Sequence, residues 1–418
     1  MKCLLILVLS LFLSVLACGQ DQRLLQGVVT DGNSKLALPY CNLWLKHAGV
    51  GVTGNELGEY MLHYPEGLEK DTLVVSYIGF ETVEKPASQL LQTTELDFQL
   101  IRKNLTLQNV VIGPVLSADA MISKVVGALP ANLNTDASAL HGFFRGYVKS
   151  DSKYDKLMEG DIRLSTTGFN WKRNVWNRYE IELNEARASQ INGRVADVKK
   201  ANNLDNIIDL YEFSFYNLLV NPHCKMSYAI DTTEWLGVDR IVKISFKHED
   251  EENGLVRYGT LRINTSDWAI LEMEYSMKLT KKLDKQILKE NDSVRFRQTA
   301  EHYFIKNTRF EGKYYLGYIK YSLVNQIMQP ASDFDFFVTM EYATNQISTT
   351  SKTKIHSGTP LDRKQNLYAQ VTSKPYHPEF WKTCNLILET PELEQIRKDI
   401  NAQGDINGQF EKPSRNGK

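Results

Sequence analysis

Residues 71–80 read Asp-Thr-Leu-Val-Val-Ser-Tyr-Ile-Gly-Phe, a short run of β-branched and aromatic residues that stops at a glycine. Valine, threonine and tyrosine favour strands, and a glycine after such a run marks a break. The preceding segments repeat the pattern: each is short, rich in strand-forming residues and bounded by turn residues. They are Leu24–Thr30 with the turn pair Asp31-Gly32, Cys41–Lys46, Gly51–Thr53 and Glu59–Leu62. Such closely spaced strands predict an antiparallel β-sandwich over residues 24–101.

The spacing of these motifs resembles that of a known family. The motifs are Gly27–Asp31, Leu38-Pro39, Gly51–Tyr60 and Asp71–Phe80. Together they resemble the carboxypeptidase-regulatory-like domain, a transthyretin-like sandwich common in envelope proteins and TonB-dependent receptors of Gram-negative bacteria. The resemblance implies a fold and an envelope location, and it brings no catalytic residues. We expect residues 102–116 to form a linker, and the rest of the chain lacks the spaced membrane strands of a receptor barrel.

Residues 117–388 carry the pattern of a larger antiparallel β domain. Leu271–Leu279 alternates strictly between apolar and polar residues, and Phe334–Tyr342 does so for most of its length. A period of two is typical of strands with one face on an apolar interior. Apolar residues at helical spacing predict helices near 119–129, ended by Pro130, and near 203–219. A curved sheet with a helix against its concave side fits this pattern and is similar in outline to the half-barrel of periplasmic lipoprotein carriers.

Residues 389–418 predict a C-terminal helix and a polar tail, with Thr390 as the cap and Pro391 at the first helical position. The segment before the helix, Tyr376–Lys382, resembles the ends of uncharacterised envelope proteins that carry the same N-terminal domain. This resemblance implies no activity. The whole chain therefore predicts a mainly β fold: an N-terminal β-sandwich, a larger antiparallel β domain for which a half-barrel is one arrangement, and a few helices.

Residues 1–19 have the features of a signal peptide, so we expect export. A positive end is followed by an apolar run from Leu4 to Leu16 and by the small residues Ala17-Cys18-Gly19. Two cleavages fit this segment. Leu13–Cys18 can act as a lipobox that leaves Cys18 as a lipidated first residue, or the ordinary peptidase can cut after Gly19. The expected location is the periplasm or the outer membrane. The protein carries a lipid anchor only if the lipobox is used.

No motif in the sequence names a catalytic activity, a metal site or a cofactor. The H-x-x-E spacings at His63–Glu66 and His248–Glu251 lack a further zinc ligand, and surface loops explain both. The net charge of −1 argues against a nucleic-acid partner. Cys224 and Cys384 could form a bridge in an oxidising compartment or stay as buried free thiols.

Aromatic residues late in the chain are the best candidates for a binding surface. They are Tyr314, Tyr318, Tyr321, Phe334 and Phe336. Two interpretations remain open: these rings line an apolar cavity or a partner surface, or they form a filled core with cross-strand pairs. We expect a non-enzymatic envelope binding or assembly protein whose partner is an envelope protein or an apolar ligand. The alternative is an envelope hydrolase with a noncontiguous site in the C-terminal domain.

Overall fold

The computed structural model describes residues 22–103, 116–150, 153–170, 180–190, 204–221, 224–289, 291, 293–330, 333–349, 359–362, 367–373 and 375–401. The expected signal peptide 1–19 with Cys18, most of the linker 102–116 and the tail after residue 401 lie outside this part of the chain. Strands account for more than half of the described residues, which confirms the predicted mainly β fold. Within the described residues, no helix is both long and apolar enough to cross a membrane.

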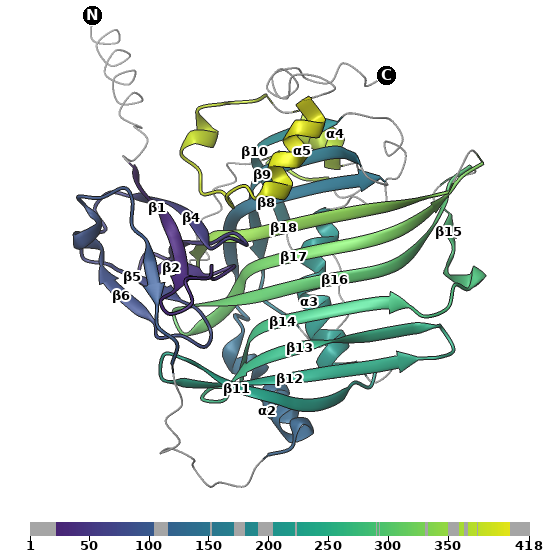
Figure 1. Cartoon of the computed structure of the whole chain (residues 1–418), viewed down its shortest axis with the longest axis horizontal. Helices are drawn as coiled ribbons and strands as arrows, with labels where there is room; N and C mark the ends of the chain where they lie inside the picture. Colours follow the sequence, from purple (N-terminus) through teal and green to yellow (C-terminus); the bar gives the residue numbers. More distant parts are fainter. Residues whose placement is uncertain are drawn as a thin grey trace, which may run out of the picture.

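The N-terminal domain is a β-sandwich, as predicted (Figure 1). Its strands are β1 (Gln22–Asp31), β2 (Asn42–Leu45), β3 (Val50–Thr53), β4 (Glu59–Pro65), β5 (Thr72–Ser76), β6 (Val83–Pro86) and β7 (Phe98–Leu100). One sheet has the order β4-β1-β7 and the other the order β3-β2-β5-β6. Leu25, Leu43 and Leu73 are completely buried between the sheets. The alternation seen in the sequence therefore places one side of each strand in a common core.

The second domain is a large antiparallel sheet that curls into a half-barrel, also as predicted. Its strands are β8 (Ser138–Ser150), β9 (Lys153–Thr166), β10 (Glu180–Gln190), β11 (Ser227–Leu236), β12 (Asp239–Asp250), β13 (Leu255–Asn264), β14 (Ala269–Leu279), β16 (Arg295–Phe310), β17 (Lys313–Met328) and β18 (Phe334–Ser348), with the short β15 (Leu288–Lys289) beside β16 and β19 (Thr359–Pro360) beside β10. The spatial order is β11-β12-β13-β14-β16-β17-β18-β8-β9-β10. Val50 of β3 pairs with Gln346 near the end of β18, so the sandwich is hydrogen-bonded to an interior strand of this sheet, beyond the residues of β18 that pair with β17.

Two helices, α2 (Ala118–Asn132) and α3 (Leu204–Phe215), pack against what we call the inner face of the half-barrel. Helix α2 is capped by Ser117, whose Oγ accepts a hydrogen bond from the Ala120 N–H at 3.2 Å. The sequence predicted that Pro130 ends this helix, but the helix continues to Asn132. The prediction was wrong because the Leu133 N–H still bonds to the Leu129 carbonyl, so the last turn closes around the proline.

Helix α3 continues as one π-helical turn at Tyr216–Val220. Its buried side chains Ile207, Tyr211 and Phe215 face the inner side of the sheet. The Tyr211 hydroxyl donates to Asn307 Oδ1 at 2.8 Å, and the Asn307 amide in turn donates to the Ile270 carbonyl at 2.7 Å. The hydroxyl of Tyr211 and the amide of Asn307, two polar groups that enter this core, are therefore hydrogen-bonded.

The C-terminal segment lies on the opposite side of the sheet, which we call the outer face. Residues 375–390 form what we call the C-terminal strap, which contains a single 3-10 turn at Phe380–Lys382 and no strand among its described residues. Helix α5 (Pro391–Asn401) follows and buries Leu393 and Ile396 against β8 and β9. A further short helix, α4 (Leu367–Thr372), packs beside β10.

Candidate functional site

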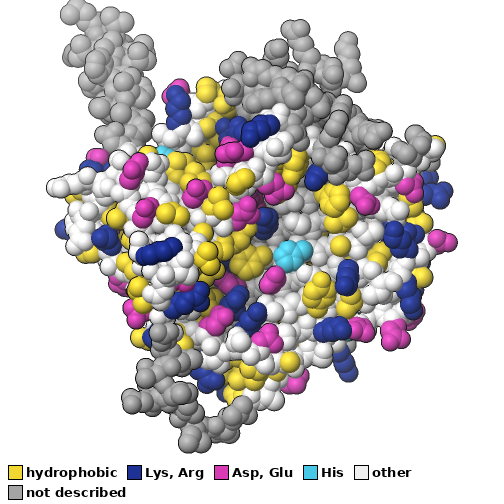
Figure 2. All heavy atoms as spheres, in the orientation of Figure 1, with side chains coloured by type: hydrophobic (Ala, Val, Ile, Leu, Met, Phe, Trp, Pro, Cys, Tyr) yellow, Lys and Arg dark blue, Asp and Glu magenta, His cyan; other side chains and the backbone are white. Residues whose placement is uncertain are grey.

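A cleft of about 970 Å³ lies between the sandwich and the outer face of the half-barrel. We call it the interdomain cleft. It lies where the two domains meet, on a face where charged and apolar side chains are interspersed (Figure 2). Its charged and aromatic lining comes from both domains: Asp31, Tyr40, Tyr77, Phe80, Arg102 and Lys103 from the sandwich and its last residues, and Glu234, Trp235, Arg262, Glu272, Glu274, His302, Phe304 and Lys320 from the sheet.

Tyr40 forms a wall of the cleft on the sandwich side. Its ring stacks on Tyr318 with centroids 5.0 Å apart and lies 5.7 Å from the ring of Phe304. The Tyr40 carbonyl accepts a hydrogen bond from the ammonium of Lys306. Its backbone has a φ of 57°, in the left-handed region that costs a non-glycine residue on the order of 1 kcal/mol. Contacts to two strands of the other domain therefore hold a strained residue in place at the domain junction.

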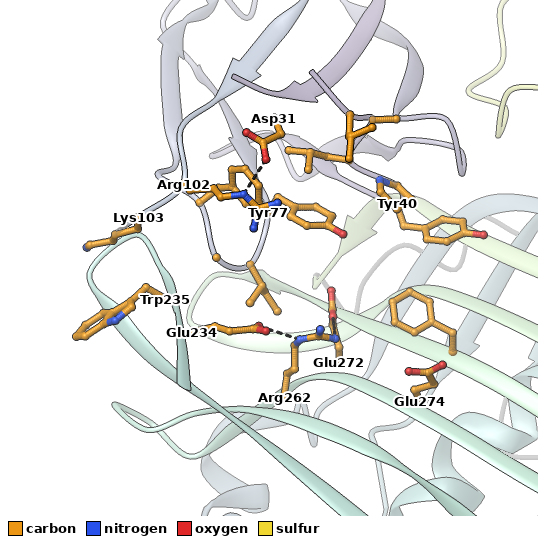
Figure 3. A pocket seen from close by; sticks show the side chains of 18 of the residues that line it. Asp31, Tyr40, Tyr77, Arg102, Lys103, Glu234, Trp235, Arg262, Glu272 and Glu274 are labelled. Carbon is orange, nitrogen blue, oxygen red and sulfur yellow. Dashed lines mark hydrogen bonds and ion pairs between the residues drawn. The ribbon is translucent and has the colours of Figure 1, made fainter. Parts of the chain in front are cut away.

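The floor of the cleft is built from paired charges. Arg262 on β13 donates to Glu234 at 3.0 Å and to Glu272 at 2.9 Å (Figure 3). The ammonium of Lys306 lies 3.3 Å from the same Glu272. Tyr77 points into the cleft from the sandwich side, and burial raises the pKa of its hydroxyl to about 12. This phenol is therefore neutral at ordinary pH and can donate a hydrogen bond.

A row of side chains, all of them charged except one phenylalanine, crosses the outer face from strand to strand. The cross-strand register places them in one line, which we call the outer row: Glu274 (β14), Phe304 (β16), Lys320 (β17), Glu341 (β18), Arg145 (β8), Glu159 (β9) and Arg187 (β10). Beyond Phe304, acidic and basic residues alternate. Opposite charges on neighbouring strands attract, so the row supports the strand order.

The strap covers one half of the outer row. Arg145 donates to Glu159 at 2.8 Å, to Glu341 at 3.1 Å and to the Ile387 carbonyl of the strap at 2.8 Å. The guanidinium of Arg187 lies 4.3 Å from the ring centroid of Trp381, which also belongs to the strap. Burial opposes the ionisation of Glu159, but Arg145 and Arg187 outweigh it and hold the pKa of this carboxyl at about 2.

The other half of the outer row opens into the interdomain cleft. The side chain of Glu274 is exposed there, and it makes no hydrogen bond or ion pair with any residue that the structure describes. Lys320 is half-buried, with its ammonium 3.9 Å from Glu56 and 3.5 Å from the Tyr40 hydroxyl. His302 sits in the neighbouring row, where Nδ1 lies 3.0 Å from Ser276 Oγ.

No group of three His, Cys, Asp or Glu side chains in the described part of the chain could hold a metal ion. His63 is buried in β4 under the strap, because Asn385 accepts from the His63 N–H at 2.6 Å and donates to its carbonyl at 2.9 Å. The expectation of a surface loop at His63 was therefore wrong. Cys224 and Cys384 are free thiols on opposite faces of the sheet, where Cys224 packs against the inner core and Cys384 against the outer face.

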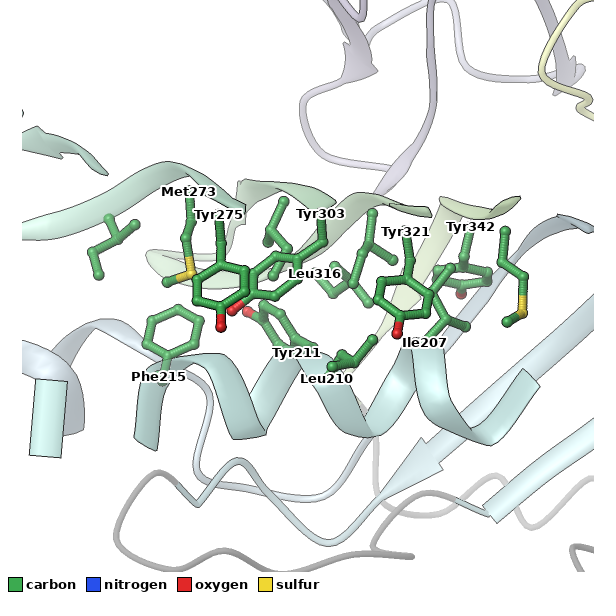
Figure 4. Close-up of a cluster of buried hydrophobic side chains, with 14 of the residues drawn as sticks. Ile207, Leu210, Tyr211, Phe215, Met273, Tyr275, Tyr303, Leu316, Tyr321 and Tyr342 are labelled. Atoms are coloured by element: carbon green, nitrogen blue, oxygen red, sulfur yellow. The ribbon is translucent and has the colours of Figure 1, made fainter. Parts of the chain in front are cut away.

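The structure does not bring the five predicted aromatic residues together. Tyr314, Tyr321, Phe334 and Phe336 are buried in the inner core, in the cluster that also contains α3 (Figure 4). Tyr318 is completely buried on the outer face, where its hydroxyl donates to Glu341 at 2.9 Å. Side chains of α3 occupy the inner face opposite Tyr275, Tyr303 and Tyr321.

A β-bulge explains why Tyr314 and Tyr318 lie on different faces. Lys306 of β16 pairs with Tyr318 of β17, but the next residue, Asn307, pairs with Leu316, so Gly317 is the extra residue. A bulge shifts the alternation of side chains by one. The Cβ of any other residue at position 317 would collide with the Thr308 hydroxyl, so the glycine permits the bulge.

The cleft residues were missed because they come from segments distant in the sequence, between Asp31 and Ser322. One signal was present in the sequence. Glu274 and Lys320 lie on the polar sides of strands along which apolar and polar residues alternate clearly. That pattern identifies an outer face, but it does not show which part of the face stays uncovered.

Comparisons with known proteins identify the N-terminal domain. None of the curated proteins matches the chain. A DUF1329 family protein from Desulfovibrio piger is similar over 57% of this chain and 96% of its own, with 8% identity and a TM-score of 0.25. Lipovitellin, from a study of its lipid–protein interactions, is similar over 58% of this chain and 29% of its own, with 7% identity and a TM-score of 0.25. Residues 25–112 match the family model of the CarboxypepD_reg-like domain, so the N-terminal sandwich is a domain of this family.

Proposed function

We propose that the protein is a non-enzymatic binding or assembly protein of the cell envelope that holds its partner in the interdomain cleft. The observation that carries the proposal is a cleft of about 970 Å³ with aromatic rings and charged groups from both domains on its walls. Concave sites with apolar walls and a few fixed polar groups are where proteins usually bind ligands.

The inner face supports this choice of site. A carrier of apolar ligands needs an open apolar cavity. Here the rings of Phe215 and Tyr211 of α3 each pack against Phe169 with centroids 5.2 Å apart, and their own centroids are 5.5 Å apart. The cleft on the outer face offers a mixed polar and aromatic lining instead. Such a lining suits a partner with polar groups better than it suits a purely apolar ligand.

An envelope location is part of the proposal. It is supported by the signal-peptide features of residues 1–19 and by the CarboxypepD_reg-like domain. The protein would be exported to the periplasm or the outer membrane, with Cys18 as the lipid-anchored residue if the lipobox is used.

Filling the cleft tests the binding site. Ser322 lines the cleft, and a Ser322→Trp substitution would occupy part of its volume. The matched control is Ser123→Trp on the exposed side of α2. We expect tagged wild-type and Ser123→Trp protein to co-purify the same envelope component from solubilised membranes, and Ser322→Trp to lose it. Equal recovery with all three proteins would refute the assignment of the site.

One observation favours the hydrolase alternative: the Ser276 hydroxyl and the His302 ring are 3.0 Å apart near the open half of the outer face. A histidine next to a serine can act as its general base. A fluorophosphonate probe reacts with activated serines, so labelling of wild-type protein that disappears in Ser276→Ala would establish an enzyme. The binding proposal predicts no labelling of either protein.

A further inference from the structure

The outer face already binds one extended polypeptide, its own C-terminal strap. The strap makes two contacts with the outer row. The buried Arg145 donates a hydrogen bond to the main-chain carbonyl of Ile387, and the ring of Trp381 stacks on the guanidinium of Arg187. Asn385 adds a pair of hydrogen bonds to the main chain of His63. None of these contacts requires the strap to join the sheet as a strand.

The apolar surface under the strap continues into the interdomain cleft. Trp381 and Ile387 of the strap belong to the same buried cluster as Tyr318, with Tyr40 and Phe304 packed against it. Tyr40 and Phe304 are also walls of the cleft. The covered and the open halves of the outer row therefore form one continuous surface, and the strap occupies only part of it.

The charges of the open half show what an occupant must supply. Most groups that line the cleft are already paired: Arg102 with Asp31 at 2.7 Å, and Arg262 with two carboxylates. Glu274 remains without an ion pair among the described residues, and it stands directly opposite Phe304 on the next strand. An exposed carboxylate beside an aromatic ring fits a cationic side chain, because the ammonium or guanidinium can contact both.

From this continuity and this unpaired carboxylate we infer that the interdomain cleft binds an extended polypeptide segment of a partner protein. The segment carries a lysine or arginine for Glu274 and, within two residues of it, an aromatic residue for the wall formed by Tyr40 and Phe304. The inference rests on the proposed function, since it specifies the occupant of the same cleft. Opposed side chains on neighbouring strands lie about 5 Å apart, so a basic residue and a ring that are close in sequence can reach both positions.

Peptide display tests this inference with defined probes. A library of random peptides about 12 residues long is selected on the purified protein, and enriched peptides are synthesised and measured by fluorescence anisotropy. We expect enriched peptides to contain a basic residue next to an aromatic one. Glu274→Lys should weaken their binding about tenfold or more, because it replaces attraction by repulsion at the cationic residue.

The matched control reverses a charge elsewhere on the same sheet. Asp335 of β18 is exposed and makes no ion pair with described residues, so Asp335→Lys gives the same change in net charge away from the cleft. It should leave peptide affinity within about twofold of wild type. Thermal unfolding of both variants shows whether each is folded.

Three results would overturn the inference: no enriched peptide, peptides that bind Glu274→Lys as well as wild type, or equal losses in Glu274→Lys and Asp335→Lys. Binding to phosphatidylethanolamine and phosphatidylglycerol vesicles that Glu274→Lys abolishes would assign the cleft to lipid and also overturn it. The proposed function would survive these results if Ser322→Trp still removed a co-purified component. The proposed function fails on a separate result, namely that Ser322→Trp protein co-purifies the same component as the wild-type protein.

Discussion

Arg145 on β8 and Glu159 on β9 face each other across the sheet, and the Arg145 Nε donates to Glu159 Oε1 at 2.8 Å. Both side chains are at most 2% exposed, because the strap lies over them. A buried charge is costly unless it is paired, so this relationship links the strap to the stability of the sheet.

Removing Arg145 should destabilise the protein strongly. Arg145→Ala leaves Glu159 and Glu341 buried without one of their cationic partners, and loss of one member of a buried pair costs about 3–5 kcal/mol. Urea unfolding followed by circular dichroism measures the free energy of unfolding. The control Arg240→Ala removes an exposed arginine of β12 and should change it by about 0.5 kcal/mol or less. If both variants lost the same small amount of unfolding free energy, the buried ion pairs of Arg145 would not stabilise the sheet as proposed.

The carboxyl of Asp161 should make stability depend on pH. Burial raises its pKa from 3.8 to about 6, while the Asn184 amide, which donates to it at 2.9 Å, opposes the shift. The folded state therefore holds this proton more tightly than the unfolded state does. The stabilisation that this bound proton gives to the folded state is complete below about pH 4, and it is lost as the pH rises through about 6.

Asp161→Asn removes this titration and keeps an acceptor for Asn184. We expect equal unfolding free energies for variant and wild type near pH 4, and a variant more stable by about 2 kcal/mol at pH 7.5. Asp335→Asn, at an exposed carboxyl, should match wild type at both pH values. A variant that is no more stable than wild type at pH 7.5 would show that Asp161 is not desolvated.

Much of the fold could be predicted from the sequence. The first five strands of the sandwich follow from local features, because each of them ends within a few positions of a turn residue. The half-barrel strands followed from alternation, as in Leu271–Leu279, and α3 from the spacing of Ile207, Tyr211 and Phe215. The prediction that α2 ends at Pro130 was wrong, because a helix tolerates a proline in its final turn when the next residues close that turn.

The candidate site could not be predicted in the same way. Tyr314 and Tyr318 are an even number of residues apart, so strict alternation would place both on one face of the sheet. The bulge at Gly317 places them on opposite faces. The cleft depends on where the sandwich meets the sheet, which is a long-range packing outcome. The strap has little regular structure, so no periodic pattern shows that it covers half of the outer row.

The inner face should behave as a packed core. Phe215 is 1% exposed and touches the rings of Phe169 and Tyr211, so Phe215→Ala should lower the free energy of unfolding by about 3–5 kcal/mol. Phe213→Ala, on the same helix but only partly buried, should cost less. A loss below about 1 kcal/mol in Phe215→Ala would mean that α3 packs loosely and leaves room for a ligand.

Lipidation can be decided at a single residue. If the lipobox is used, cells grown with labelled palmitate should incorporate the label into the wild-type protein and not into Cys18→Ala, because the thiol of Cys18 is the atom to which the acyl-bearing diacylglyceryl group is attached. Cys384→Ala is the control for acylation of another thiol. Absence of label in the wild-type protein would favour cleavage after Gly19 and a soluble periplasmic form.

Site-specific photocross-linking in intact cells tests the central claim most directly. A photoreactive phenylalanine derivative is placed at Ser322 in the interdomain cleft or at Ser123 on α2, and irradiated cells are examined for adducts by immunoblotting and mass spectrometry. A discrete adduct at position 322 with none at position 123 is the result that a partner-filled cleft predicts. No adduct at position 322, or the same adducts at both positions, would contradict it.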